Sequence, residues 1–140
     1  MARILIAEDE DAIRNLIARA LLQDGHEVMT ANDGGEALDV IEREHGAFDL
    51  LLTDIRMPVM DGIALALATA RDHPGITILL MTGYADQRER ASNLTALIHD
   101  VITKPFTLAT IRAAVSTALL AGAQHHASSE PPKPNGINSP

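Results

Sequence analysis

Short apolar runs alternate along this chain with longer segments in which apolar residues recur at helical spacing. Continuous apolar runs of this length are typical of strands that are buried on both faces of a parallel sheet. We expect strands at residues 4–7, 27–31, 50–53, 76–81 and 101–103. The pattern therefore predicts an α/β fold built on a doubly wound, five-stranded parallel sheet.

Five helices are expected between and after these strands, because their apolar positions follow the spacing of a helix with one buried face. In chain order these positions are Ile13, Leu16, Ile17, Ala20 and Leu21; Leu38 and Ile41; Ile63, Ala66, Leu67 and Ala70; Ala91 and Leu94; and Leu108, Ile111, Val115, Ala118 and Leu119. The fourth helix, expected over residues 86–97, is the most polar, and Thr107 is expected to cap the fifth. We expect one folded domain over residues 1–121 and a disordered, Pro/Ser-rich tail over residues 122–140.

Polar residues directly follow four of the predicted strands, namely Glu8, Asp9, Asp54, Thr82 and Lys104. The carboxyl ends of parallel strands meet at one edge of a sheet, where ligands bind in folds of this kind, so we expect these residues to gather there. Two carboxylates about 4 Å apart repel each other by about 4 kcal/mol at an effective dielectric constant near 20. Three crowded acids therefore need a cation or a proton, and oxygen ligands of this kind suit Mg²⁺.

Phosphoryl transfer is the chemistry that this set of side chains favours. Asp54 would be the nucleophile that forms an aspartyl phosphate, while the ammonium of Lys104 and the hydroxyl of Thr82 would bind phosphoryl oxygens. Each residue alone has an ordinary structural explanation, as a turn residue, a solvated charge or a good strand former. Their shared position at the strand ends favours the chemical interpretation.

Composition narrows the classes of function. The chain of 140 residues has a net charge of −8 at pH 7, which argues against direct binding to nucleic acid or to an anionic membrane. It has no cysteine, so disulfides and thiolate chemistry are excluded. No apolar run approaches the roughly 20 residues of a membrane span, and the amino terminus does not resemble a signal peptide. We expect a cytoplasmic location.

Four segments together resemble the receiver domain of bacterial two-component response regulators, the CheY-like domains. They are ILIAEDE (4–10), LLTDIRMPVMDGI (51–63), MTGYAD (81–86) and Lys104-Pro105-Phe106, and the resemblance covers roughly residues 2–121. It implies a flavodoxin-like sheet with strand order 2-1-3-4-5 and a phosphorylation switch of the phosphorelay rather than an enzyme that turns over a separate substrate.

The resemblance also implies a role for each site residue. Asp54 would be the phosphoacceptor, Asp9 a direct Mg²⁺ ligand, Glu8 a ligand through water, and the backbone carbonyl of Arg56 a third protein contact. Thr82 and Lys104 would bind the phosphoryl group, and the bond before Pro105 would be cis. Separately from the resemblance, Arg56 and Tyr84 stand two residues after Asp54 and Thr82, where they would flank the phosphoryl group. They are either ordinary surface loop side chains or a shield that keeps water from the acyl phosphate.

Partners follow from the same resemblance. A histidine kinase or a phosphotransfer protein would donate the phosphoryl group, and an unidentified protein would bind the face formed by the fourth helix, fifth strand and fifth helix. The start AED and residues 51–63 also resemble stand-alone receivers of the CpdR type, which would imply a link to proteolysis machinery. The sequence does not name the cognate kinase or the output partner.

The chain departs from the usual receiver pattern at two positions. Glu8 stands where most receivers have an aspartate, and Val101 stands where the family usually has a tyrosine or phenylalanine that reports the switch. Val101 cannot act as an aromatic lever, so either the movement of Thr82 is coupled through other packing or the switch is weak.

Two alternatives remain. The chain could be an interaction module whose acidic pocket is a relic, which metal-dependent labelling would decide. It could also be a phosphatase of the haloacid-dehalogenase type. Such an enzyme requires a second aspartate, the general acid, two residues after the nucleophile, and this chain has Arg56 there.

Overall fold

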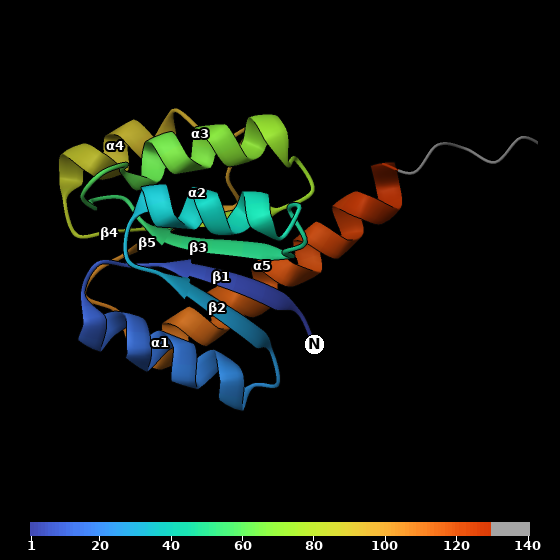
Figure 1. Cartoon of the computed structure of the whole chain (residues 1–140), viewed down its shortest axis with the longest axis horizontal. Helices are drawn as coiled ribbons and strands as arrows, with labels where there is room; N and C mark the ends of the chain where they lie inside the picture. The colour runs from blue at the N-terminus through green and yellow to red at the C-terminus, as the bar shows by residue number, and fades with distance from the viewer. Residues whose placement is uncertain (130–140) are drawn as a thin grey trace, which may run out of the picture.

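The structure, a computed structural model, describes residues 1–129 and contains one sheet surrounded by helices (Figure 1). Its elements in chain order are β1 (Arg3–Ala7), α1 (Asp11–Gln23), β2 (Glu27–Ala31), α2 (Gly34–Arg43), β3 (Leu50–Asp54), α3 (Gly62–Asp72), β4 (Thr77–Thr82), α4 (Ala85–Ser92), β5 (Asp100–Thr103) and α5 (Leu108–Ser129). All strand pairs are parallel, in the order β2-β1-β3-β4-β5. The predicted fold class and strand order are confirmed.

Helices cover both faces of the sheet, with α1 and α5 on one face and α2, α3 and α4 on the other (Figure 1). Successive side chains of the central strands point to opposite faces of the sheet. In β1, for example, Ile4 and Ile6 pack towards α1 and α5, while Leu5 and Ala7 pack towards α2. The continuous apolar runs of the sequence thus reflect burial on both sides, as a parallel sheet requires.

The register of the strands brings their polar ends together. Ala7 of β1 is paired with Thr53 of β3, and Asp54 is paired with Met81 of β4. Thr82 at the end of β4 is paired with Thr103, the residue before Lys104. All the predicted site residues therefore lie within two residues of the end of a strand, at the same edge of the sheet.

Two helices differ in length from the sequence expectation. Helix α4 ends at Ser92, short of the expected residue 97, and the chain continues in turns in which the amide of Leu97 donates to Leu94 O at 2.8 Å. Its few apolar side chains cannot hold a longer helix against the sheet, since helices in proteins depend on packing of an apolar face. Ala91 and Leu94 nevertheless point inwards as expected.

Helix α5 runs to Ser129, past the domain boundary expected at residue 121, and its start is capped by Thr107, whose Oγ1 accepts from the amide of Thr110 at 3.1 Å. The part of the predicted tail from residue 130 lies outside the described residues, and the disordered tail stays a prediction. Within residues 1–129, no helix has both the length and the apolar character that crossing a membrane requires.

Candidate functional site

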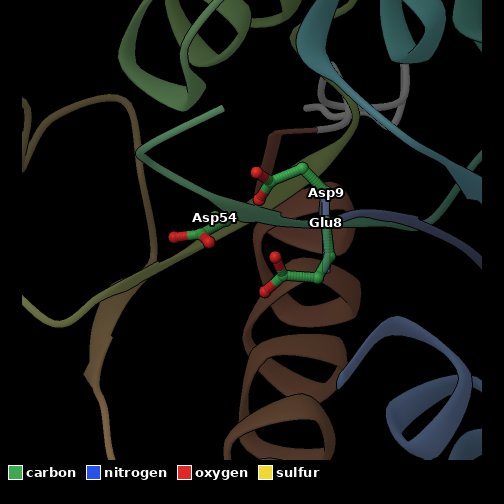
Figure 2. A group of neighbouring side chains, drawn as sticks. All are labelled: Glu8, Asp9 and Asp54. Carbon is green, nitrogen blue, oxygen red and sulfur yellow. The ribbon is translucent and has the colours of Figure 1, made fainter. Parts of the chain in front are cut away.

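Three acids meet at the carboxyl edge of the sheet. Glu8 and Asp9 follow β1, Asp54 ends β3, and each offers a carboxylate oxygen within 4.8 Å of the others. Figure 2 shows that the side chains of Glu8 and Asp9 leave the chain in different directions, with Asp54 beside them. Glu8 is fully buried and Asp54 is nearly so, whereas Asp9 is exposed. The predicted acidic cluster is therefore present.

Lys104 joins two of these acids. Its Nζ donates to Asp54 Oδ2 at 2.8 Å and to Glu8 Oε1 at 3.0 Å, and the peptide bond to Pro105 is cis, as the sequence resemblance implied. Burial, the largest single effect, lowers the pKa of Lys104, but the hydrogen bonds to Asp54 and Glu8 and the negative charges of these two groups together outweigh it, so the pKa is raised. The ammonium is therefore charged at neutral pH.

The charges at this edge do not balance. Three carboxylates face one ammonium, which leaves two negative charges when all groups are ionised. The pKa of Asp9 is raised, chiefly because the surrounding protein partly desolvates its carboxylate although the side chain as a whole is exposed, and also through its interaction with Glu8. A hard divalent cation with oxygen ligands fits both the surplus charge and the donor set.

The acids differ in how free they are to bind a cation. Glu8 is occupied on both oxygens, because Oε1 accepts from Lys104 and Oε2 accepts from the amide of Glu10 at 3.1 Å. Asp9 is exposed, and Asp54 uses Oδ2 for Lys104, which leaves Oδ1 for another ligand. Asp9 and Asp54 are thus the better direct ligands, and Glu8 is better placed to act through water.

Asp54 opens onto a pocket of about 460 Å³. The residues that line it are Asp9, Glu10, Asp54, Arg56, Gly83, Tyr84 and Lys104. The guanidinium carbon of Arg56 lies 4.9 Å from the centroid of the Tyr84 ring, a cation–π contact between the loop after β3 and the loop after β4. Sequence reasoning missed Glu10 as a lining residue, although its position directly after Glu8 and Asp9 could have suggested it.

Position 62, in the segment Met60-Asp61-Gly62 that follows Asp54, must be a glycine for a steric reason. A Cβ at this position would lie 2.1 Å from the carbonyl oxygen of Asp54, so only glycine permits α3 to begin against the backbone of β3. The amide of Gly62 donates to Ile55 O at 2.7 Å, and Asp61 caps α3 by accepting from the amide of Ala64 at 2.8 Å. The motif therefore anchors the backbone that carries Asp54.

Like Glu8, Thr82 is a predicted site residue that does not line the pocket. Unlike Glu8, Thr82 has no side-chain hydrogen bond to Lys104 in the part of the chain that the structure describes. It is 1% exposed, and its hydroxyl donates to Gln87 Oε1 of α4 at 2.9 Å while accepting from the amide of Tyr84 at 3.2 Å. Among the described residues, its hydrogen bonds go to the α4 side and none goes to Asp54. The structure thus places Thr82 next to the site with its hydroxyl directed away from it.

The family model of the response regulator receiver domain matches residues 4–116. The chain belongs to this family. Receivers are signalling switches of two-component systems rather than typical enzymes, and they bind Mg²⁺ at an acidic pocket. In this chain Glu8, Asp9 and Asp54 form an acidic cluster.

Relatives of different lengths share the receiver. The response regulator receiver protein CpdR of Brucella abortus is 37% identical over 108 residues, which cover 77% of this chain and 88% of CpdR. The regulatory protein AtoC of Escherichia coli is 40% identical over 118 residues, covering 84% of this chain but only 25% of AtoC. The chain therefore spans about a quarter of AtoC.

Solved structures show the same fold. The response regulator TrrA of Thermotoga maritima, in complex with Mg²⁺ and beryllium fluoride, superimposes with a TM-score of 0.73 at 30% identity. The match covers 84% of this chain and 99% of TrrA.

Proposed function

We propose that this receiver is a phosphorylation switch in which Asp54 accepts a phosphoryl group from the phosphohistidine of a histidine kinase or a phosphotransfer protein. The observation that carries the proposal is the Lys104 ammonium 2.8 Å from Asp54 Oδ2, in a pocket that also holds the exposed carboxylate of Asp9. A nucleophilic carboxylate, a fixed cation and a second acid are what aspartyl phosphorylation requires.

In the transfer step, a carboxylate oxygen of Asp54 attacks the phosphorus, and the P–N bond of the donor breaks. The imidazole leaves with the electron pair of that bond. Lys104 then pairs with a phosphoryl oxygen, because its partner carboxylate has become an acyl phosphate. This chain's contribution is positioning and charge neutralisation rather than turnover of a separate substrate.

Asp9, Asp54 and the backbone carbonyl of Arg56 would hold Mg²⁺ directly, and Glu8 would bind it through water. The bound ion would neutralise charge on the transferring oxygens. The surplus of two negative charges and the free oxygens of Asp9 and Asp54 support this assignment.

The output is proposed to be binding of another protein at the face formed by α4, β5 and α5. Helix α4, whose only buried residue is Ala91 among the side chains that the structure describes, belongs to this face, and Thr82, at the strand end next to the site, donates a hydrogen bond to it. Proteolysis machinery is the proposed kind of partner, on the strength of the likeness to CpdR. A cytoplasmic location, without direct contact to nucleic acid or membrane, is part of the proposal.

Labelling with acetyl phosphate tests the proposal. We expect the wild type to gain one phosphoryl group in the presence of Mg²⁺ and none in excess chelator, as read by intact-protein mass spectrometry. Asp54→Ala should take up none. Asp39→Ala, which removes an exposed acid of α2, is the matched control and should label like the wild type. Absence of labelling in the wild type would support the relic module instead.

A further inference from the structure

The hydroxyl of Thr82 links the phosphorylation site to α4. It lies at the end of β4, beside Asp54 in the sheet, and it donates to the side-chain amide oxygen of Gln87 at 2.9 Å. Gln87 lies in the first turns of α4 and is partly buried. The contact is therefore a direct hydrogen bond between the strand that borders the site and the helix that borders the output face.

A hydroxyl carries one proton and can donate one good hydrogen bond at a time. The Thr82 hydroxyl has two possible acceptors, Gln87 Oε1 at 2.9 Å and the carbonyl oxygen of Tyr84 at 3.3 Å, and it accepts from the amide of Tyr84 at 3.2 Å. The shorter distance makes Gln87 the principal acceptor of its proton. A phosphoryl oxygen on Asp54 that recruits this proton must take it from Gln87. The proton of Thr82 therefore cannot be donated to the phosphoryl group and to Gln87 Oε1 at the same time.

Helix α4 depends on few anchors, so the loss of one matters. Among its residues whose side chains the structure describes, only Ala91 is buried. Its N-terminus has no side-chain cap. Apart from the Thr82 bond, Arg88 donates to Thr103 Oγ1 and Arg90 donates to Asp61 Oδ2 at 3.3 Å.

We infer that Gln87 is a positioning residue that latches α4 to Thr82 in the unphosphorylated receiver and is released when Thr82 turns to the phosphoryl group. The inference rests on the proposed function of Asp54 and extends it to the path of the switch. It accounts for coupling in a chain that has Val101, a small aliphatic residue, on β5 next to α4. The released Gln87 side chain frees the first turns of α4.

Because the Thr82–Gln87 bond is coupled to ligand binding at Asp54, it can be tested by ligand affinity at the site and by amide exchange in α4. If Gln87 holds Thr82 away from the site, removing its acceptor should favour every state in which Thr82 faces Asp54. Gln87→Met keeps the length of the side chain but cannot accept the bond. We expect its affinity for beryllium fluoride, with Mg²⁺, to rise about fivefold, the factor expected for one net hydrogen bond.

Amide hydrogen exchange over residues 83–95 of the full chain tests the helix end of the latch. In the wild type, exchange should speed up severalfold when beryllium fluoride and Mg²⁺ are added. In Gln87→Met, exchange should already be fast without the ligand and should change little on its addition. Glu89→Met is the control, since it places the same residue on the exposed side of α4, and it should behave like the wild type.

A Thr82→Val background supplies the decisive comparison. There, Gln87→Met should alter neither beryllium fluoride affinity nor exchange, because the hydroxyl that it contacts is gone. Equal effects of Gln87→Met with and without that hydroxyl would overturn the latch, as would wild-type affinity and exchange in the single variant. Failure of the wild type to bind beryllium fluoride or to label with acetyl phosphate would instead overturn the proposed function, and the latch with it.

Discussion

The two helices next to β4 and β5 are held in very different ways. On one face, α5 buries Ile111, Val115 and Ala118 in the large core that also contains Leu79 and Met81 of β4. On the other face, Ala91 is the one buried residue of α4 among those whose side chains the structure describes, and polar side chains make its hydrogen bonds to Thr82 and Asp61. The same strand therefore has a firmly packed helix on one side and a loosely attached one on the other.

This difference in packing matches the two requirements of a switch, a rigid site and an element that can move. The site needs fixed geometry, and its acids stand at the carboxyl ends of β1 and β3, in which every residue except Arg3 is buried. A response needs an element that can change at small cost, and local stability is lowest where few apolar side chains are buried. The receiver combines both by placing Thr82 at the boundary between the two regions.

The largest expected effect comes from equal truncations on the two sides. Leu79→Ala removes a fully buried side chain from the α5 side and should lower the free energy of unfolding by about 3 kcal/mol. Leu94→Ala, beside α4, removes a partly buried side chain and should cost about 1 kcal/mol. Urea denaturation measures both, and equal losses would contradict the comparison.

Lys104→Met tests how much the ion pairs of Lys104 contribute to the stability of the site. It leaves the fully buried carboxylate of Glu8 without its ammonium partner and leaves three acids facing one another. We expect a loss of about 2 kcal/mol in metal-free buffer, somewhat below the range for breaking a fully buried ion pair because Lys104 is partly exposed. Adding Glu8→Gln should restore part of this loss, and urea denaturation of the single and double variants at pH 7 measures it. A loss that Glu8→Gln leaves unchanged would argue against the ion pair as its cause.

Asp9→Asn tests the surplus charge. A carboxyl group with a raised pKa holds its proton more tightly in the folded state, so the ionised Asp9 lowers metal-free stability as the pH rises from its ordinary pKa of 3.8 through the raised value. At pH 7 the variant should therefore melt above the wild type without metal. Mg²⁺ at ten times its dissociation constant should stabilise the wild type by about 1.4 kcal/mol. It should stabilise the variant much less, and thermal melts with Mg²⁺ and with chelator measure both effects.

The sequence predicted the site because its residues follow strands, and strand ends in a parallel sheet are placed by topology alone. Glu8, Asp9, Asp54 and Lys104 come together as expected for that reason. The cis bond before Pro105 could be anticipated only through the family resemblance. No local pattern in the sequence distinguishes it from the far commoner trans form.

What the sequence could not predict depends on tertiary contacts between side chains. The strand end placed Thr82 correctly, but its hydroxyl could face Asp54 or α4, and the bond to Gln87 decides this. The end of α4 at Ser92 was missed because its polar pattern gives no clear stop. The small and polar residues after 121 predict a tail, whereas α5 extends to Ser129, because alanines among these residues are good helix formers.

The smallest expected effect concerns the contact that spans the fixed and the loose regions. Arg56 belongs to the loop after β3, Tyr84 precedes α4, and the two pack across the pocket with a guanidinium-to-ring distance of 4.9 Å. Exposed cation–π contacts contribute about 0.5–1 kcal/mol, so removing this one should open the pocket to water only modestly. We expect Arg56→Ala and Tyr84→Ala each to shorten the lifetime of the acyl phosphate about two- to fivefold, measured as loss of label after the donor is removed.

Tyr84→Phe keeps the ring and should decay like the wild type. The double alanine variant should decay no faster than either single one, because both remove the same contact; additive losses would show that Arg56 and Tyr84 shield the phosphoryl group independently and that this bridge does not join the two regions.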